Sequence, residues 1–165
     1  MKHILLSQDI VDYSVKYSNE NNLGNRINNN GSKLEQLVGI ISENTIRKYL
    51  GYDLMKPNSG FDGGFDIIYK GLKLDIKSMR RKYKPLESYV SNIFDDQKKH
   101  NCDGYIFTSL STEDKTLTIC GWINKDDFYK KATLYKKGTK RFRGNDTFNL
   151  RADNWEILNK YLKTF

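Results

Sequence analysis

The dipeptide Lys70-Gly71 constrains the fold more than any other feature of the sequence. It lies between two runs of alternating apolar residues, 65–69 and 72–77. A two-residue loop of this kind between strand-like runs predicts a β-hairpin, and the loop length fixes the register of the two strands. In that register Asp66 faces Asp75, with Cβ atoms about 4.5–5.5 Å apart.

Two carboxylates that face each other across a ladder repel, and a chain keeps such a pair when a cation lies between them. Lys77 follows Asp75 by two residues, so it shares the same face of the strand, about 6.5–7 Å further along. Two acids and a lysine on one face predict a hydrolytic site that holds a divalent metal ion. Without the metal, the repulsion predicts that Asp75→Asn stabilises the fold.

The chain is basic, with 28 Lys and Arg against 20 Asp and Glu and a net charge of +8. Many of these charges gather in two segments without acids. The first contains Lys77, Arg80, Arg81, Lys82 and Lys84, and the second contains Lys130, Lys131, Lys136, Lys137, Lys140, Arg141 and Arg143. Tyrosine and phenylalanine are interleaved with the cations. Clustered cations suit phosphates and aromatic rings suit bases, so both segments are predicted to contact nucleic acid rather than to be solvated basic loops.

Other classes of site lack the residues that they need. Cys102 and Cys120 are the two cysteines and have no zinc-ligand spacing, so buried free thiols are expected. No apolar run approaches the ~18–20 residues of a membrane span. The apolar residues 4–6 are too short a run for a signal peptide. We therefore expect a cytoplasmic protein with no membrane partner.

Local patterns predict one domain over residues 1–165. Helices are expected at about 8–18, 33–50, 86–99, 125–132 and from 153 onward, and strands at 65–69, 72–77, 104–110, 116–123 and 148–151. Ser32 and Glu35 have the spacing of a capping box, and Gly51 should end that helix. The expected parts are an N-terminal helix with an Asn-rich loop (1–32), a core (33–123), and a basic segment with a C-terminal helix (124–165).

Glu43 is an acid on the helix expected at 33–50, and it lies roughly opposite the centre of the main apolar stripe. Glu35 has a structural role at the cap, whereas Glu43 has no such role that the sequence reveals. Two interpretations stay open: a functional acid, or an acid that is exposed or paired with Arg47, as helix surfaces commonly carry.

The order of helix with Glu43, hairpin with Asp66 and Asp75-Ile-Lys77, helix and strand resembles the PD-(D/E)xK nuclease superfamily over about residues 33–123. The resemblance implies an α/β fold with a restriction-endonuclease-like core, a mixed central β-sheet flanked by helices. Gln97, followed by the run 103–107, resembles that family's second helix leading into the next strand. Phe65 stands where the family name has proline.

By this resemblance, the protein is expected to be a Mg²⁺-dependent DNA nuclease, an endonuclease, with Mn²⁺ as a substitute metal. The implied metal ligands are Asp66, Asp75, the Ile76 carbonyl and Glu43, and Lys77 would orient the attacking water, stabilise charge or act as a base. The expected DNA contacts are Arg80, Arg81, Lys82, Lys84, Gln97, Lys136, Lys137, Lys140, Arg141 and Arg143. Two alternatives stay open, a structure-selective Holliday-junction-type resolvase and a non-catalytic nucleic-acid-binding module. A homodimer also stays open.

Overall fold

The computed structural model describes residues 1–21, 32–56, 64–143 and 146–165. Its elements in chain order are β1 (Lys2–Leu5), α1 (Gln8–Glu20), α2 (Lys33–Tyr49), β2 (Ile67–Tyr69), β3 (Leu72–Arg81), β4 (Val90–Phe94), the 3₁₀ helix η1 (Asp95–Lys99), β5 (Gly104–Ser111), β6 (Thr116–Asn124), α3 (Lys125–Lys131), β7 (Thr133–Tyr135), β8 (Lys140–Arg143), β9 (Asp146–Asn149), β10 (Asn154–Leu158) and the 3₁₀ helix η2 (Asn159–Tyr161).

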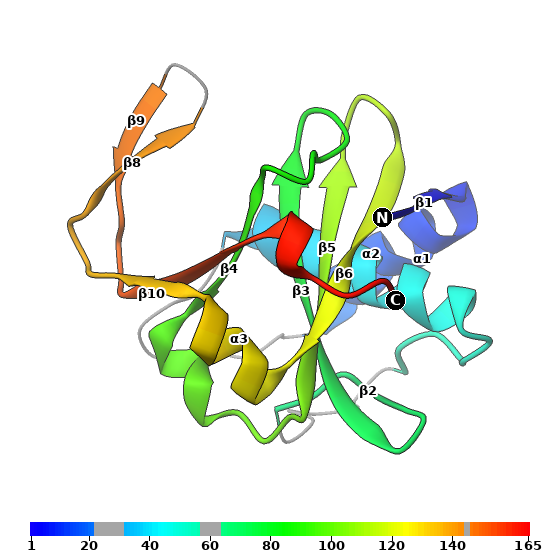
Figure 1. Cartoon of the computed structure of the whole chain (residues 1–165). Helices are drawn as coiled ribbons and strands as arrows, with labels where there is room; N and C mark the ends of the chain where they lie inside the picture. Colours follow the sequence, from blue (N-terminus) through cyan, green and yellow to red (C-terminus); the bar gives the residue numbers. More distant parts are fainter. Residues whose placement is uncertain (22–31, 57–63, 144–145) are drawn as a thin grey trace.

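A five-stranded sheet with the order β1-β6-β5-β3-β2 forms the centre of the molecule (Figure 1). The pair β3–β5 is parallel, and the pairs β1–β6, β5–β6 and β2–β3 are antiparallel. The strands β4, β10 and β7 form a second sheet, and β8 pairs with β9. The expected α/β class with a mixed sheet flanked by helices is therefore confirmed.

The hairpin predicted from Lys70-Gly71 is present. Tyr69 pairs with Leu72 and Ile67 with Leu74, as the two-residue loop requires. Both loop residues have positive φ angles, 50° for Lys70 and 80° for Gly71. Two consecutive positive φ angles identify a type I′ turn, whose twist matches that of the flanking strands.

The two faces of the central sheet have separate cores. On one face α2 packs Val38, Ile41 and Ile46 against Leu74, Ile106 and neighbouring residues of β5 and β6. On the other face, α3, β4 and β10 cover the sheet. The residues of this second core include Ile93, Tyr105, Phe107, Phe128 and Ile157. Strand β5 is buried on both faces along its whole length, so its polar residues Thr108, Ser109 and Ser111 are buried together with its apolar ones.

Helix α2 begins and ends as its sequence predicts. Both halves of the capping box are formed: the Ser32 side chain accepts from the Glu35 backbone N–H, and the Glu35 carboxylate accepts from the Ser32 backbone N–H. Gly51 follows the last turn with a φ of 78°. Such a left-handed residue after a helix is favourable for glycine because it has no Cβ.

Two helix predictions are wrong. Of the segment 86–99, residues 90–99 form strand β4 and the 3₁₀ helix η1, and of the segment from 153, residues 154–161 form strand β10 and the 3₁₀ helix η2. These two strands pair with each other over five residues, from Asn154 opposite Phe94 to Leu158 opposite Val90. Apolar residues at helical spacing also fit a strand with one buried face, and this long-range pairing selects the strand.

Smaller differences concern element ends. Helix α1 extends to Glu20, β2 begins only at Ile67, and the strand expected at 148–151 is β9, Asp146–Asn149. Residues 22–31 of the Asn-rich loop lie outside the described residues. Within the described ranges, no helix combines the length and apolar character that crossing a membrane requires.

Candidate active site

Strand β3 presents Asp75 and Lys77 on the face of the sheet away from α2. Their neighbours Leu74 and Ile76 face the α2 core, because side chains alternate along a strand. Lys77 Nζ lies 2.7 Å from Asp75 Oδ2. The Asp75 side chain is only 6 % exposed and that of Lys77 16 %, so this is a largely buried ion pair.

The Asp75 carboxylate is held in its charged form. Burial acts to raise its pKa, but the Lys77 ammonium and the neighbouring His100 ring outweigh burial, and the pKa lies below the ordinary value. His100 Nδ1 lies 3.6 Å from Asp75 Oδ2. Both the Lys77 ammonium and the His100 ring therefore act on the same buried carboxylate oxygen, Oδ2.

Asp66 lies in a bend directly before β2 rather than in the strand, so the expected ladder pair with Asp75 is not formed. The Asp66 backbone N–H donates to the Leu74 carbonyl at 2.9 Å. The Asp66 carboxylate accepts from the backbone N–H of Ile76, with Oδ2 and N 2.6 Å apart. Asp66 therefore still reaches the segment Asp75–Lys77, through its side chain.

The environment of Asp66 disfavours its negative charge. Burial of the carboxyl group, followed by the charges of Asp75 and Glu43, raises the pKa of Asp66 well above its ordinary value. Lys77 and the Ile76 N–H oppose this rise without cancelling it. The structure thus brings the charges of Glu43, Asp66, Asp75 and Lys77 close enough to act on one another.

Glu43 is buried on α2 rather than exposed, and it pairs with Arg47, as one interpretation of the sequence allowed. Its Oε1 accepts from Arg47 Nε at 2.7 Å. Arg47 also donates through Nη2 to the Asp66 carbonyl oxygen at 2.7 Å. Arg47 therefore joins the helix acid to the backbone of Asp66 and fixes the position of the bend.

His100 is a site residue that the sequence did not indicate. In the sequence it is a histidine with no other potential ligand at a recognisable spacing. It follows η1 and precedes β5, and β5 runs parallel to β3 with Tyr105 beside Asp75. Residues just before β5 therefore lie next to the early part of β3. The strand predicted at 104–110 indicated that His100 lies just before a strand. Only the pairing of β5 with β3 places His100 beside Asp75.

Gly64 brings the chain before Asp66 against His100. Its φ is +99°, and a Cβ at this position would lie 2.9 Å from the Asn101 backbone nitrogen and 3.1 Å from His100 Cβ. Only glycine allows both this backbone conformation and this approach. The bend that carries Asp66 is thus fixed on two sides, by Gly64 and by Arg47.

Asp66 and Asp75 fit a hard divalent cation in their chemistry. Asp66 carries a charge that its surroundings disfavour, and a cation would relieve this. The charge of Asp75 is already offset by the Lys77 ammonium, so a metal ion would share this carboxylate with Lys77. Carboxylate oxygens are the ligands that Mg²⁺ prefers. In the described part of the chain, however, no three His, Cys, Asp or Glu side chains form a group that could hold a metal ion.

The first basic segment divides into exposed and anchored residues. Arg81 donates from Nη2 to the Val90 carbonyl at 2.7 Å and lies over the Tyr89 ring. Gln97 is half-buried in η1 rather than on an α-helix. The residues of this segment with exposed side chains are Arg80, Lys82 and Lys84.

Among its described residues, the second basic segment has two cationic side chains with acidic partners. Lys136 Nζ lies 2.8 Å from Asp153 Oδ2. Arg141 forms a two-point ion pair with Glu156, a buried residue of β10. Lys137 and Lys140 are exposed, and the side chain of Arg143 lies outside the described part.

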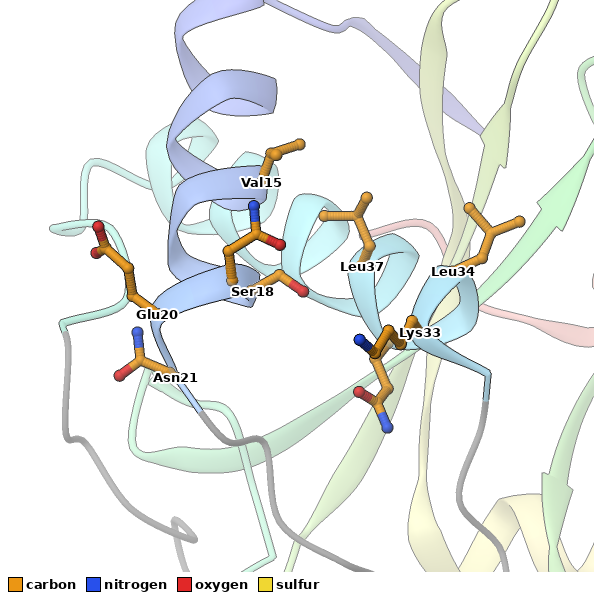
Figure 2. A pocket seen from close by; sticks show the side chains of 9 residues that line it. Val15, Ser18, Glu20, Asn21, Lys33, Leu34 and Leu37 are labelled. Carbon is orange, nitrogen blue, oxygen red and sulfur yellow. The ribbon is translucent and has the colours of Figure 1, made fainter.

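A hollow of about 600 Å³ lies between the end of α1 and the start of α2 (Figure 2). Val15, Leu34 and Leu37 line it together with polar residues of both helices. It shares no residue with the site around Asp75.

No protein-family model matches the chain, and no curated protein or solved structure matches it. The chemistry of the site therefore rests on its own residues.

Proposed function

We propose that this protein is a Mg²⁺-dependent DNA endonuclease with a restriction-endonuclease-like core of the PD-(D/E)xK type. One observation carries the proposal: Lys77 Nζ lies 2.7 Å from the buried Asp75 carboxylate, while the Asp66 carboxylate accepts from the N–H of Ile76, the residue between them. Two acids and a lysine thereby share one short stretch of β3 and the bend beside it.

Phosphodiester hydrolysis needs an activated water and stabilisation of the negative charge that develops on the phosphate. A Mg²⁺ ion held by Asp66, Asp75, the Ile76 carbonyl and Glu43 would supply a Lewis acid and a more acidic bound water. Lys77 supplies a positive charge and a proton at Nζ next to the reacting phosphate. Asp75 positions that ammonium, and burial of the pair strengthens its electrostatic effect.

The order of elements supports the proposed core. Helix α2 with its acid precedes the β2–β3 hairpin, and β5 then joins the sheet parallel to β3. One element departs from the resemblance, because β4 and η1 stand where a second α-helix is expected. The proposal therefore depends more on the hairpin and its side chains than on the whole topology.

Cleavage of DNA by the purified protein tests the proposal directly. Supercoiled plasmid should be nicked or linearised with Mg²⁺ or Mn²⁺ and should stay intact with EDTA. Lys77→Ala should abolish cleavage, while Lys73→Ala, a matched change on the same face of β3, should retain it. If wild-type protein leaves every form of DNA intact with either metal, the proposal is wrong.

The rival function is a nucleic-acid-binding module without catalysis. The pairing of Glu43 with Arg47 and of Asp75 with Lys77 favours it, because these pairs neutralise buried acids in the absence of a metal. A binding module would bind linear and branched DNA without any metal and would cleave neither form of DNA. Preferential cleavage of a four-way junction over linear duplex would instead identify the resolvase alternative.

A further inference from the structure

Strands β8 and β9 form a two-stranded hairpin that projects from the body of the fold (Figure 1). The register pairs Lys140 with Asn149 and Phe142 with Thr147. Side chains alternate along each strand, so these four residues share one face of the hairpin. All four are exposed.

That face has a composition that packing within the chain does not explain. Phe142 is 72 % exposed, more than any other exposed aromatic residue in the described ranges. The same face carries the Lys140 ammonium, the Thr147 hydroxyl group and the Asn149 amide, and none of its four residues is an acid. Burial of an aromatic ring of this size is strongly favourable, so a surface phenylalanine among hydrogen-bonding side chains indicates a partner with both apolar and polar groups.

The opposite face anchors the hairpin. Arg141 makes its two-point ion pair with Glu156 of β10, and its guanidinium lies 4.1 Å from the centre of the Tyr135 ring. Glu156 is 8 % exposed, and Arg141 is half-buried. Arg141 thus orients the hairpin on the body and leaves the face with Phe142 turned to solvent.

Charge and shape complementarity select duplex DNA as the partner. Residues 133–156 contain six lysines and arginines against three acids, two of which pair with Lys136 and Arg141. A two-stranded β-ribbon fits the major groove of B-form DNA, which is about 12 Å wide, whereas the major groove of duplex RNA is too deep and narrow for side chains. In that groove an amide recognises adenine, a lysine recognises guanine, and phenylalanine contacts the methyl group of thymine.

We infer that the β8–β9 hairpin enters the major groove of duplex DNA with Lys140, Phe142, Thr147 and Asn149 toward the bases. The inference rests on the proposed function for its partner, DNA, but not on cleavage. In this arrangement Arg141 orients the hairpin on the body of the protein. The hairpin recognises bases, in addition to the contacts that the basic segments make with phosphates.

Binding without metal tests this inference separately from catalysis. The probe is a fluorescent mixed-sequence DNA duplex of about 21 base pairs, two helical turns, with a duplex RNA of the same sequence for comparison. Phe142→Ala should weaken DNA binding about tenfold, the effect of one lost base contact. Tyr161→Ala removes an exposed aromatic ring outside the hairpin, next to a lysine, and should leave affinity unchanged.

Two further comparisons separate groove recognition from simple attraction. DNA with uracil in place of thymine lacks the methyl groups, so it should bind wild-type protein more weakly and Phe142→Ala protein equally well. Glu156→Gln makes the protein more positive, so attraction alone predicts tighter binding. Release of the Arg141 anchor predicts weaker binding, provided that circular dichroism shows a folded variant.

The results also distinguish the two proposals. Unchanged affinity in Phe142→Ala, or equal affinity for duplex RNA and DNA, would overturn the hairpin inference even if wild-type protein cleaves DNA. Loss of affinity in Phe142→Ala, together with the uracil effect, would support the inference even if no metal restores cleavage.

Discussion

The carboxylate of Asp66 accepts the backbone N–H of Ile76, with Oδ2 and N 2.6 Å apart. Strand β2 begins one residue after Asp66, and its ladder with β3 extends only to the pair Ile67–Leu74. The side chain of Asp66 therefore satisfies a backbone donor just beyond that ladder. This contact places one carboxylate beside Asp75 and gives Asp66 a structural role together with its proposed role in metal binding.

Lys77→Ala should abolish cleavage while DNA binding largely persists, because the lysine is proposed to act on the reacting phosphate. The loss of turnover should be at least about 10²-fold, the usual effect of a positioned proton-transfer group. Removing one partner of a buried ion pair also costs about 3–5 kcal/mol of stability. Single-turnover cleavage at a temperature where the variant is folded gives the measurement, and wild-type turnover would contradict the assigned site.

Asp66→Asn should raise the melting temperature of the metal-free protein, and Asp75→Asn should lower it. The charge of Asp66 is disfavoured, with a raised pKa, whereas the charge of Asp75 is held by Lys77, with a lowered pKa. This reverses the expectation from sequence, in which loss of the Asp75 charge stabilises the fold. Thermal unfolding at neutral pH with EDTA tests both variants. A higher melting temperature for Asp75→Asn would mean that repulsion between the acids dominates.

Gly64→Ala should destabilise the protein by more than Gly51→Ala. Both glycines have positive φ angles, but only Gly64 has backbone and side-chain atoms within 4 Å of an added Cβ. The conformation alone costs about 1–2 kcal/mol, and the contact with Asn101 and His100 adds to this at Gly64. Urea unfolding of the two variants measures the difference. Equal destabilisation would show that the segment moves freely away from His100.

Replacing Arg80, Lys82 and Lys84 with serine should reduce the salt dependence of DNA binding. These side chains are exposed, so they are available to phosphates. Each lost phosphate contact should lower the slope of log affinity against log salt by about 0.9 on duplex DNA. Titrations at several salt concentrations give the slope. A slope equal to that of wild-type protein would assign these charges to a solvated face.

Asp9 should contribute a stabilisation that disappears in acid. Asp9 Oδ2 lies 2.7 Å from Lys48 Nζ and joins α1 to α2. The hydrogen bond from Lys48, followed by one with Ser7, lowers the pKa of Asp9 to about 2. A group with a lowered folded-state pKa stabilises the fold above its unfolded pKa and loses this effect as the pH falls through the folded value.

Wild-type protein should therefore melt above Asp9→Asn protein at neutral pH, and the two melting temperatures should converge as the pH falls from about 5 to about 2. High salt should reduce the difference, because the pair is exposed. In a Lys48→Met background, the Asp9→Asn change should have a smaller effect, because only the contact with Lys48 is removed and that with Ser7 remains. A difference that persists at the lowest pH would indicate that Asp9 acts through packing rather than charge.

Local signals in the sequence predicted the elements that local interactions decide. The I′ turn at Lys70-Gly71 and the capping box of Ser32 and Glu35 depend on residues within four positions of one another. The segments 86–99 and 153–165 lack such signals, and their apolar spacing fits a helix as well as a strand. Pairing between β4 and β10, about sixty residues apart in the chain, made them strands.

For the candidate site, the sequence by itself determined that Asp75 and Lys77 share a face and that Asp66 approaches them, because strand alternation and a two-residue loop leave no other register. Only the tertiary structure decided the charge state of this group. His100 comes beside Asp75 through the parallel pairing of β3 and β5, and Arg47 reaches Glu43 and Asp66 from α2. Burial and neighbouring charges raise the pKa of Asp66 and lower that of Asp75, and both causes depend on which distant segments fold against the hairpin.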